Sequence, residues 1–151
     1  MHQETDTKTN SNIYIVIDTN VIVSALWSKK ADSPTVRIIE ALFDDKFIPL
    51  YHPDIIAEYI DVLYRDKFGF SEDDIICILA KIQKSGEMIT PEHTDEIFRD
   101  RDDVIFYEVV MSKHDDNAWL VTGNLKHYPQ KEFIVTPKDM MDILDAREHA
   151  L

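Results

Sequence analysis

The stretch IYIVIDTNVIVSAL, residues 13–26, opens with five consecutive apolar residues that lead directly into Asp18. A continuous β-branched and aromatic run is typical of a strand that is covered on both faces. Burying a carboxylate at the end of such a strand costs several kcal/mol unless a partner compensates it. Two interpretations follow: Asp18 caps a helix that begins just after it, or it holds a cation.

Strand-like and helical segments alternate along the rest of the chain. Helices are predicted where a capping residue or a proline precedes apolar residues at helical spacing, and strands where short β-branched runs occur. The predicted helices cover residues 33–46, 52–68, 71–86, 100–114 and 136–148, and the predicted strands cover residues 13–17, 47–51, 87–90, 118–122 and 132–136. This alternation predicts an α/β fold, with three α/β/α layers around a central, mostly parallel sheet. Ser71 is expected to cap its helix, and Gly86 to end it.

The length of 151 residues suits one domain, which we place at residues 13–148 after a disordered tail at residues 1–12. Cys77 is the only cysteine, which excludes a disulfide framework and a cysteine-based zinc site. No apolar run approaches the ~20 residues of a membrane span, and the first residues lack the apolar region of a signal peptide. We therefore expect a cytoplasmic protein.

The formal charge of −13 argues against general, charge-driven binding to nucleic acid. So many acids can serve three purposes in a protein of this size. They can gather around metal ions, they can attract a basic protein partner, or they can simply keep the surface soluble.

Several acids and amides are predicted to meet at one edge of the sheet. Asp18 ends the first strand and Asn124 follows a later one, and ligands of open parallel sheets bind beyond these carboxyl ends. Glu58 flanks the apolar stripe of its helix, and Asp103 shares the core-facing side of another. Each residue alone also fits a cap, a turn or a solvated position, but their combination at one edge indicates a site.

Four segments together resemble the PIN-domain nuclease family. They are VIDTNVIVSAL, HPDIIAEYIDVL, DRDDVIFYEVV and AWLVTGNLKHYP, at residues 16–26, 52–63, 100–110 and 118–129. Their order and spacing match that family over most of the chain, and most of all its small bacterial and archaeal members described as toxins of toxin–antitoxin pairs. The resemblance implies a metal-dependent endoribonuclease that uses Mg²⁺ or Mn²⁺. It also implies an RNA substrate, a homodimer and a basic antitoxin that covers the acidic cleft.

Carried over position by position, the resemblance assigns catalytic, metal-binding roles to Asp18, Glu58 and Asp103. Asn124 takes the fourth catalytic position, where many members of the family have Asp. An amide oxygen still ligates a hard cation but brings no charge, so a second metal ion would bind more weakly. Candidates to compensate are Asp100, Asp102 and Glu108, although the first two are expected to face solvent or to cap.

Neighbouring residues are expected to complete the site. Thr19, Asn20 and Thr122 are predicted to donate hydrogen bonds that orient the carboxylates. Lys126 and His127 follow the last motif and are predicted to contact the substrate backbone. In the implied mechanism, one metal ion activates a water and a second stabilises the leaving oxygen of the phosphodiester.

Other protein classes fit less well. A phosphohydrolase of the haloacid-dehalogenase type needs a second Asp two residues after the first, where this chain has Asn20. A signalling receiver domain needs a Lys after a late strand, which has no clear match. A catalytically degenerate PIN-like module that binds RNA or a protein partner is the main alternative, and Asn124 supports it.

Overall fold

The computed structural model describes residues 12–150, so the predicted tail at residues 1–12 lies outside the described residues except for its last one. Within them, five parallel strands form one sheet in the order β3-β2-β1-β4-β5. The strands are β1 (Tyr14–Ile17), β2 (Ile48–Tyr51), β3 (Glu87–Met88), β4 (Ala118–Val121) and β5 (Ile134–Val135). The prediction of a parallel central sheet is confirmed.

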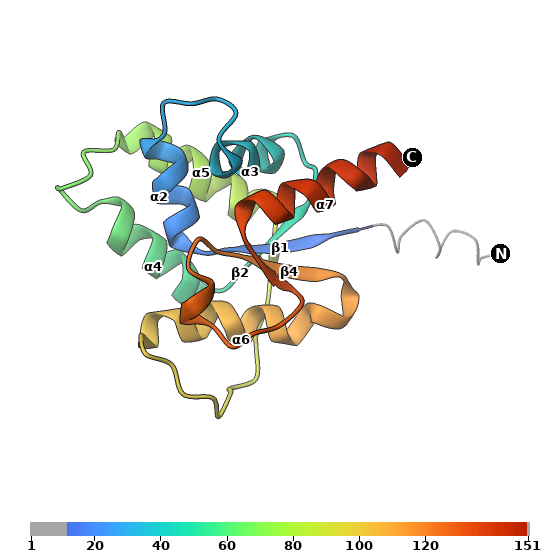
Figure 1. Cartoon of the computed structure of the whole chain (residues 1–151). Coiled ribbons are helices and arrows are strands. Elements are labelled where there is room, and N and C mark those ends of the chain that lie inside the picture. The colour runs from blue at the N-terminus through green and yellow to red at the C-terminus, as the bar shows by residue number, and fades with distance from the viewer. Residues whose placement is uncertain (1–11, 151) are drawn as a thin grey trace.

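Helices cover both faces of the sheet. The α-helices are α2 (Thr19–Trp27), α3 (Pro34–Phe43), α4 (Pro53–Leu63), α5 (Glu72–Ser85), α6 (Val104–Lys113) and α7 (Pro137–Ala150), and the short 3-10 helices are η1 (Arg101–Asp103), η2 (His114–Asp116) and η3 (Leu125–His127). Helices α3, α5 and α7 lie on one face and α6 on the other, while α2 and α4 leave the carboxyl edge of the sheet (Figure 1). This is the predicted three-layer α/β/α arrangement. Among the described helices, none is both long and apolar enough to cross a membrane.

The start of the predicted helix 100–114 differs from the expectation. Residues 101–103 form the 3-10 turn η1, and α6 begins only at Val104. The side chain of Asp100 accepts a hydrogen bond from the backbone N–H of Asp102, at 2.9 Å, and thereby caps this tighter turn. Asp103 therefore stands at the junction of the two helices rather than inside the first turn of one.

The central strand β1 sets the position of the site. Ile15, Val16 and Ile17 are almost completely buried, as the continuous apolar run predicts. The register pairs Ile17 with Val121 of β4. The residues that follow these two, Asp18 and Thr122, therefore leave the sheet side by side.

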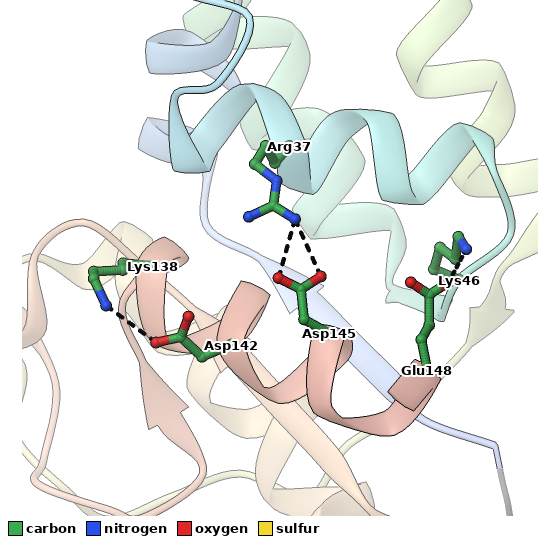
Figure 2. Close-up of polar contacts among 6 residues, drawn as sticks. All are labelled: Arg37, Lys46, Lys138, Asp142, Asp145 and Glu148. Carbon is green, nitrogen blue, oxygen red and sulfur yellow. Dashed lines mark hydrogen bonds and ion pairs between the residues drawn. The ribbon is translucent and has the colours of Figure 1, made fainter. Parts of the chain in front are cut away.

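Ion pairs fasten α7 to α3 and to the loop after it (Figure 2). The Nη2 group of Arg37 donates to both oxygens of Asp145, at 3.1 Å each, and Lys46 pairs with Glu148. These side chains are half-exposed, and the Arg37–Asp145 pair contributes at most about 1 kcal/mol. They fix the orientation of the last helix more than they stabilise the fold.

The two predicted ends of α5 have different causes. Ser71 caps the helix as expected, since its hydroxyl accepts the N–H of Asp74 at 3.1 Å. Gly86 does end the helix, but its φ of −94° is not the left-handed conformation of a glycine cap. A Cβ atom there would lie 2.3 Å from the carbonyl oxygen of Ile82 and 2.5 Å from that of Pro49. Glycine is required by the close approach of α5 to β2.

Candidate active site at the carboxyl edge of the sheet

Asp18 is a buried carboxylate with two hydroxyl partners. It takes the N-cap position of α2, and its side chain is 4% exposed. Its Oδ2 atom accepts hydrogen bonds from the hydroxyl of Thr122, at 2.7 Å, and from that of Tyr128, at 3.1 Å. Burial raises the pKa of Asp18, and these hydrogen bonds oppose the rise because they favour the charged form. They also fix the direction of the carboxylate.

The loop after β4 is tied to the start of α2. While Thr122 donates to Asp18, its hydroxyl oxygen accepts the backbone N–H of Asn124 at 3.0 Å. The side-chain oxygen of Asn20 accepts the N–H of Gly123 at 3.1 Å. Thr122 thus contacts the Asp18 carboxylate directly, whereas Asn20 binds the backbone of the loop through Gly123. The hydroxyl of Thr19 is buried and has no hydrogen-bond partner among residues 12–150.

Asp103 faces the same space without such support. Its Oδ2 atom is buried and has no hydrogen-bond partner in the described part of the chain, although Nδ1 of His127 lies 3.4 Å away. Burial raises the pKa of Asp103 to about 6, the negative charges of Asp18 and Asp100 add to the rise, and His127 opposes it. A buried, unsatisfied carboxylate oxygen beside a second carboxylate fits a hard divalent cation.

Glu58 does not form a three-acid group with Asp18 and Asp103 within residues 12–150. It is half-buried on α4, and burial raises its pKa, followed by the charge of Asp102 and then that of Asp61. Its strongest charged neighbour is thus Asp102 rather than Asp18. Within residues 12–150, no three His, Cys, Asp or Glu side chains lie close enough to hold one metal ion together.

Glu108 does not take part in this group of acids. It is buried on α6, where its carboxylate accepts the backbone N–H of Thr94 at 2.8 Å. Its charge serves to hold the extended segment that precedes η1. That Glu108 compensates for Asn124 stays a prediction, whereas the charges of the exposed Asp100 and Asp102 act on Glu58.

The last predicted site residues reach the same edge of the sheet. Asn124 is exposed just beyond β4, and Lys126 is exposed on η3. His127 is partly exposed and lies over Asp103. Of the two predicted substrate contacts, Lys126 is accessible to a ligand. His127 is also the electrostatic partner of Asp103.

Two tyrosines of the site are missed by the sequence patterns. Tyr128 is 6% exposed, and burial raises its pKa, so its hydroxyl remains a donor to Asp18. Tyr59 is fully buried, and its hydroxyl donates to the carbonyl oxygen of Ile17 at 2.6 Å. Each tyrosine follows a predicted site residue directly, His127 and Glu58. That adjacency is the only signal, since core aromatic residues occur at the same spacings.

Comparisons with known proteins identify one family and two similar proteins. A family model described as PIN domain matches residues 14–126. Uncharacterized protein MJ1680 of Methanocaldococcus jannaschii is 29% identical over 142 residues, which cover 81% of this chain and 90% of the relative. The crystal structure of PAE2754 from Pyrobaculum aerophilum is similar with a TM-score of 0.55 at 15% identity, over 90% of this chain and 91% of that one. At that identity the structural similarity concerns the fold alone.

Proposed function

Because the chain belongs to the PIN domain family, whose members are generally nucleases, we propose that it is a metal-dependent endoribonuclease. The reaction is the hydrolysis of phosphodiester bonds in RNA. The observation that carries the proposal is the pair Asp18 and Asp103. These acids come from different elements, their charges interact, and a buried oxygen of Asp103 has no hydrogen-bond partner among residues 12–150.

The donor set suits Mg²⁺ or Mn²⁺, which prefer oxygen ligands. Asp18 and Asp103 would hold the ion, with Asn124 contributing through its amide oxygen, while Glu58 on α4 would bind it through one of its waters. Mg²⁺ usually keeps several waters and takes one or two protein carboxylates, so two close acids are a sufficient core for a site. When bound, the metal supplies the positive charge that lowers the pKa of a water and stabilises the leaving oxygen.

The protein's own groups prepare that chemistry. Thr122 and Tyr128 hold Asp18 in one orientation and favour its charged form. Asn20 fixes the loop that carries Asn124, through the N–H of Gly123. Lys126 is placed to contact a phosphate of the substrate. No nucleophilic side chain is required, because water is the attacking group.

The test is cleavage of single-stranded RNA with Mn²⁺ or Mg²⁺, compared with EDTA. The Asp18→Asn variant preserves the shape of the side chain and should lose at least about a hundredfold in rate, since one charged ligand is removed. Asp142→Asn is the matched control, because Asp142 is an exposed acid on α7 that pairs with Lys138 (Figure 2). Cleavage that EDTA does not stop, or that Asp18→Asn retains, would contradict the proposal.

Asn124 separates this proposal from a catalytically degenerate module that binds RNA or protein. The Asn124→Asp variant adds a charged oxygen at the fourth position and should tighten Mn²⁺ binding measured by calorimetry. Unchanged affinity would remove Asn124 from the site. If the wild-type protein neither binds Mn²⁺ nor cleaves several RNAs, the degenerate module becomes the better description.

We also propose that the nuclease is the toxin of a toxin–antitoxin pair and a homodimer. The small size and the resemblance to toxin-like PIN proteins support this role, and the net charge of −13 suits a basic antitoxin segment. Induced expression should arrest growth with the wild-type protein but not with Asp18→Asn. Equal growth with both would argue against the toxin role, and light scattering would decide the oligomeric state.

A further inference from the structure

Three aromatic rings form a cluster beyond the end of α2. Trp27 is the last residue of that helix, and its side chain is 59% exposed. Phe68 and Phe70 stack on each other with centroids 5.1 Å apart, and Trp27 meets them nearly at right angles, at 5.1 and 6.3 Å. The indole is therefore held by two rings while much of its surface stays open to a ligand.

Three lysines lie close to the aromatic cluster in the sequence. Residues 27–30 and 67–70 contain three lysines, Lys29, Lys30 and Lys67, and no acid, whereas the chain has 29 acids and 16 basic residues. The Nζ atom of Lys67 lies 5.2 Å from the centroid of the Phe68 ring. Asp32, Asp66 and the three first-turn acids of α5, Glu72, Asp73 and Asp74, border the two segments, so the lysines stand beside the rings within an acidic surface.

The cluster is connected to the proposed active site by two helices. Helix α2 starts immediately after Asp18 and ends at Trp27, a span of about 13 Å for its nine residues. Helix α4 carries Glu58, contacts α2, and leads into the segment with Phe68 and Phe70. Figure 1 shows both helices leaving the same edge of the sheet. A strand that passes the acids can therefore continue onto the rings.

We propose that Trp27 is a stacking platform for a base of a single-stranded nucleic acid, with Phe68 and Phe70 as its support and the three lysines as phosphate contacts. This inference rests on the proposed nuclease function. Aromatic side chains that stack on bases, combined with basic groups that follow the backbone, are the general device for holding single strands without reading their sequence. Aromatic residues are also enriched in protein–protein interfaces, so a change in oligomeric state without a change in RNA affinity would assign the cluster to such an interface instead.

The test is the affinity of a labelled single-stranded RNA of about 12 nucleotides, measured by fluorescence anisotropy in EDTA so that no cleavage occurs. Trp27→Ala should weaken binding about 10- to 100-fold, and Trp27→Phe should restore most of the affinity. Ile76→Ala is the matched control, because Ile76 is a similarly exposed apolar residue, 52% exposed on α5, and its removal should leave binding unchanged.

A second measurement uses the indole itself. Trp27 and Trp119 are the only two tryptophans, so a Trp119→Phe protein reports Trp27 alone. The fluorescence emission of this protein should be quenched when RNA binds. In the cleavage assay, Trp27→Ala should raise the KM for the RNA and leave kcat unchanged. Unchanged RNA affinity and unchanged KM in Trp27→Ala would overturn the platform. The same holds if the substitution changes only the oligomeric state of the protein.

The outcomes separate this inference from the proposed function. Binding that depends on Trp27, together with no metal-dependent cleavage, would support the platform and overturn the nuclease. Cleavage that Trp27→Ala leaves unchanged at every RNA concentration would support the nuclease and overturn the platform.

Discussion

At the scale of single residues, the two central acids have unequal surroundings. The carboxylate of Asp18 accepts hydrogen bonds from Thr122 and Tyr128, whereas a buried oxygen of Asp103 has no such partner among residues 12–150. The negative charge of Asp18 contributes to the raised pKa of Asp103. Their titrations are therefore linked, and the less supported acid holds its proton to higher pH.

This asymmetry predicts how stability depends on pH without metal. The pKa of Asp103 rises from 3.8 to about 6 on folding, so between these values the folded state binds the proton more tightly than the unfolded chain. The free energy of unfolding should therefore fall as pH rises through this window, by about 3 kcal/mol at most for this group. Urea unfolding in EDTA at several pH values measures this fall.

The Asp103→Asn variant should remove that contribution. Its free energy of unfolding should exceed that of the wild-type protein by about 2–3 kcal/mol near pH 7.5, and the difference should shrink toward pH 4. Asp142→Asn, on the exposed face of α7, should show no such pattern. Parallel curves for Asp103→Asn and wild type would mean that Asp103 is not desolvated in solution.

The acids of the site could be predicted because they interrupt apolar patterns. Asp18 ends a buried strand, and Asp103 precedes the buried face of α6. The roles of Tyr59 and Tyr128 could not be predicted. A tyrosine whose hydroxyl binds a site residue and an aromatic residue that only fills the core occur at the same sequence spacings. The neighbour of Glu58 was also beyond prediction, since it depends on how the turn η1 orients Asp102.

At the scale of elements, the layers could be predicted from the alternation of strand-like and helical apolar patterns and from the capping residues at helix starts. The apolar run of β1 and the Pro and Ser starts of α3 and α5 placed these elements within a few residues of their positions. The edge strands β3 and β5 are two residues long, shorter than their apolar segments, because each pairs with one neighbour only. Tertiary pairing, rather than local sequence, sets such ends.

The contact between α5 and β2 predicts the effect of a single methyl group. Gly86→Ala would place Cβ against two backbone oxygens that belong to Ile82 and Pro49. Overpacking against backbone should cost about 2–3 kcal/mol of unfolding free energy, measured by thermal or urea unfolding. Gly69→Ala is the comparison, since Gly69 has a φ of +63° but open space around it, and should cost about 1–2 kcal/mol. An equal or smaller loss for Gly86→Ala would mean that the backbone yields to the methyl group.

At the scale of the whole molecule, charge is divided between a strongly acidic surface and a few lysines. The net charge of −13 gives no general attraction to nucleic acid. Contacts with RNA should therefore be few and local.

This division predicts a shallow salt dependence. If Lys29, Lys30 and Lys67 neutralise about three phosphates, the slope of log K against log salt should be about −2 for a single strand. Anisotropy titrations over a range of salt concentrations measure the slope. Removing one lysine, as in Lys30→Ala, should reduce it by about 0.7. A slope as steep as that of general nucleic-acid binders would require many more basic contacts.

The pairing of β1 with β4 also dictates when the site can exist during synthesis. Asp18 emerges from the ribosome early, but Thr122 and Tyr128, which hold its carboxylate, are made more than 100 residues later. Such non-local contacts form only after the intervening chain is available. A nascent chain therefore carries Asp18 through more than 100 further residues without an ordered site, and the ordered site appears only after Tyr128 has been made.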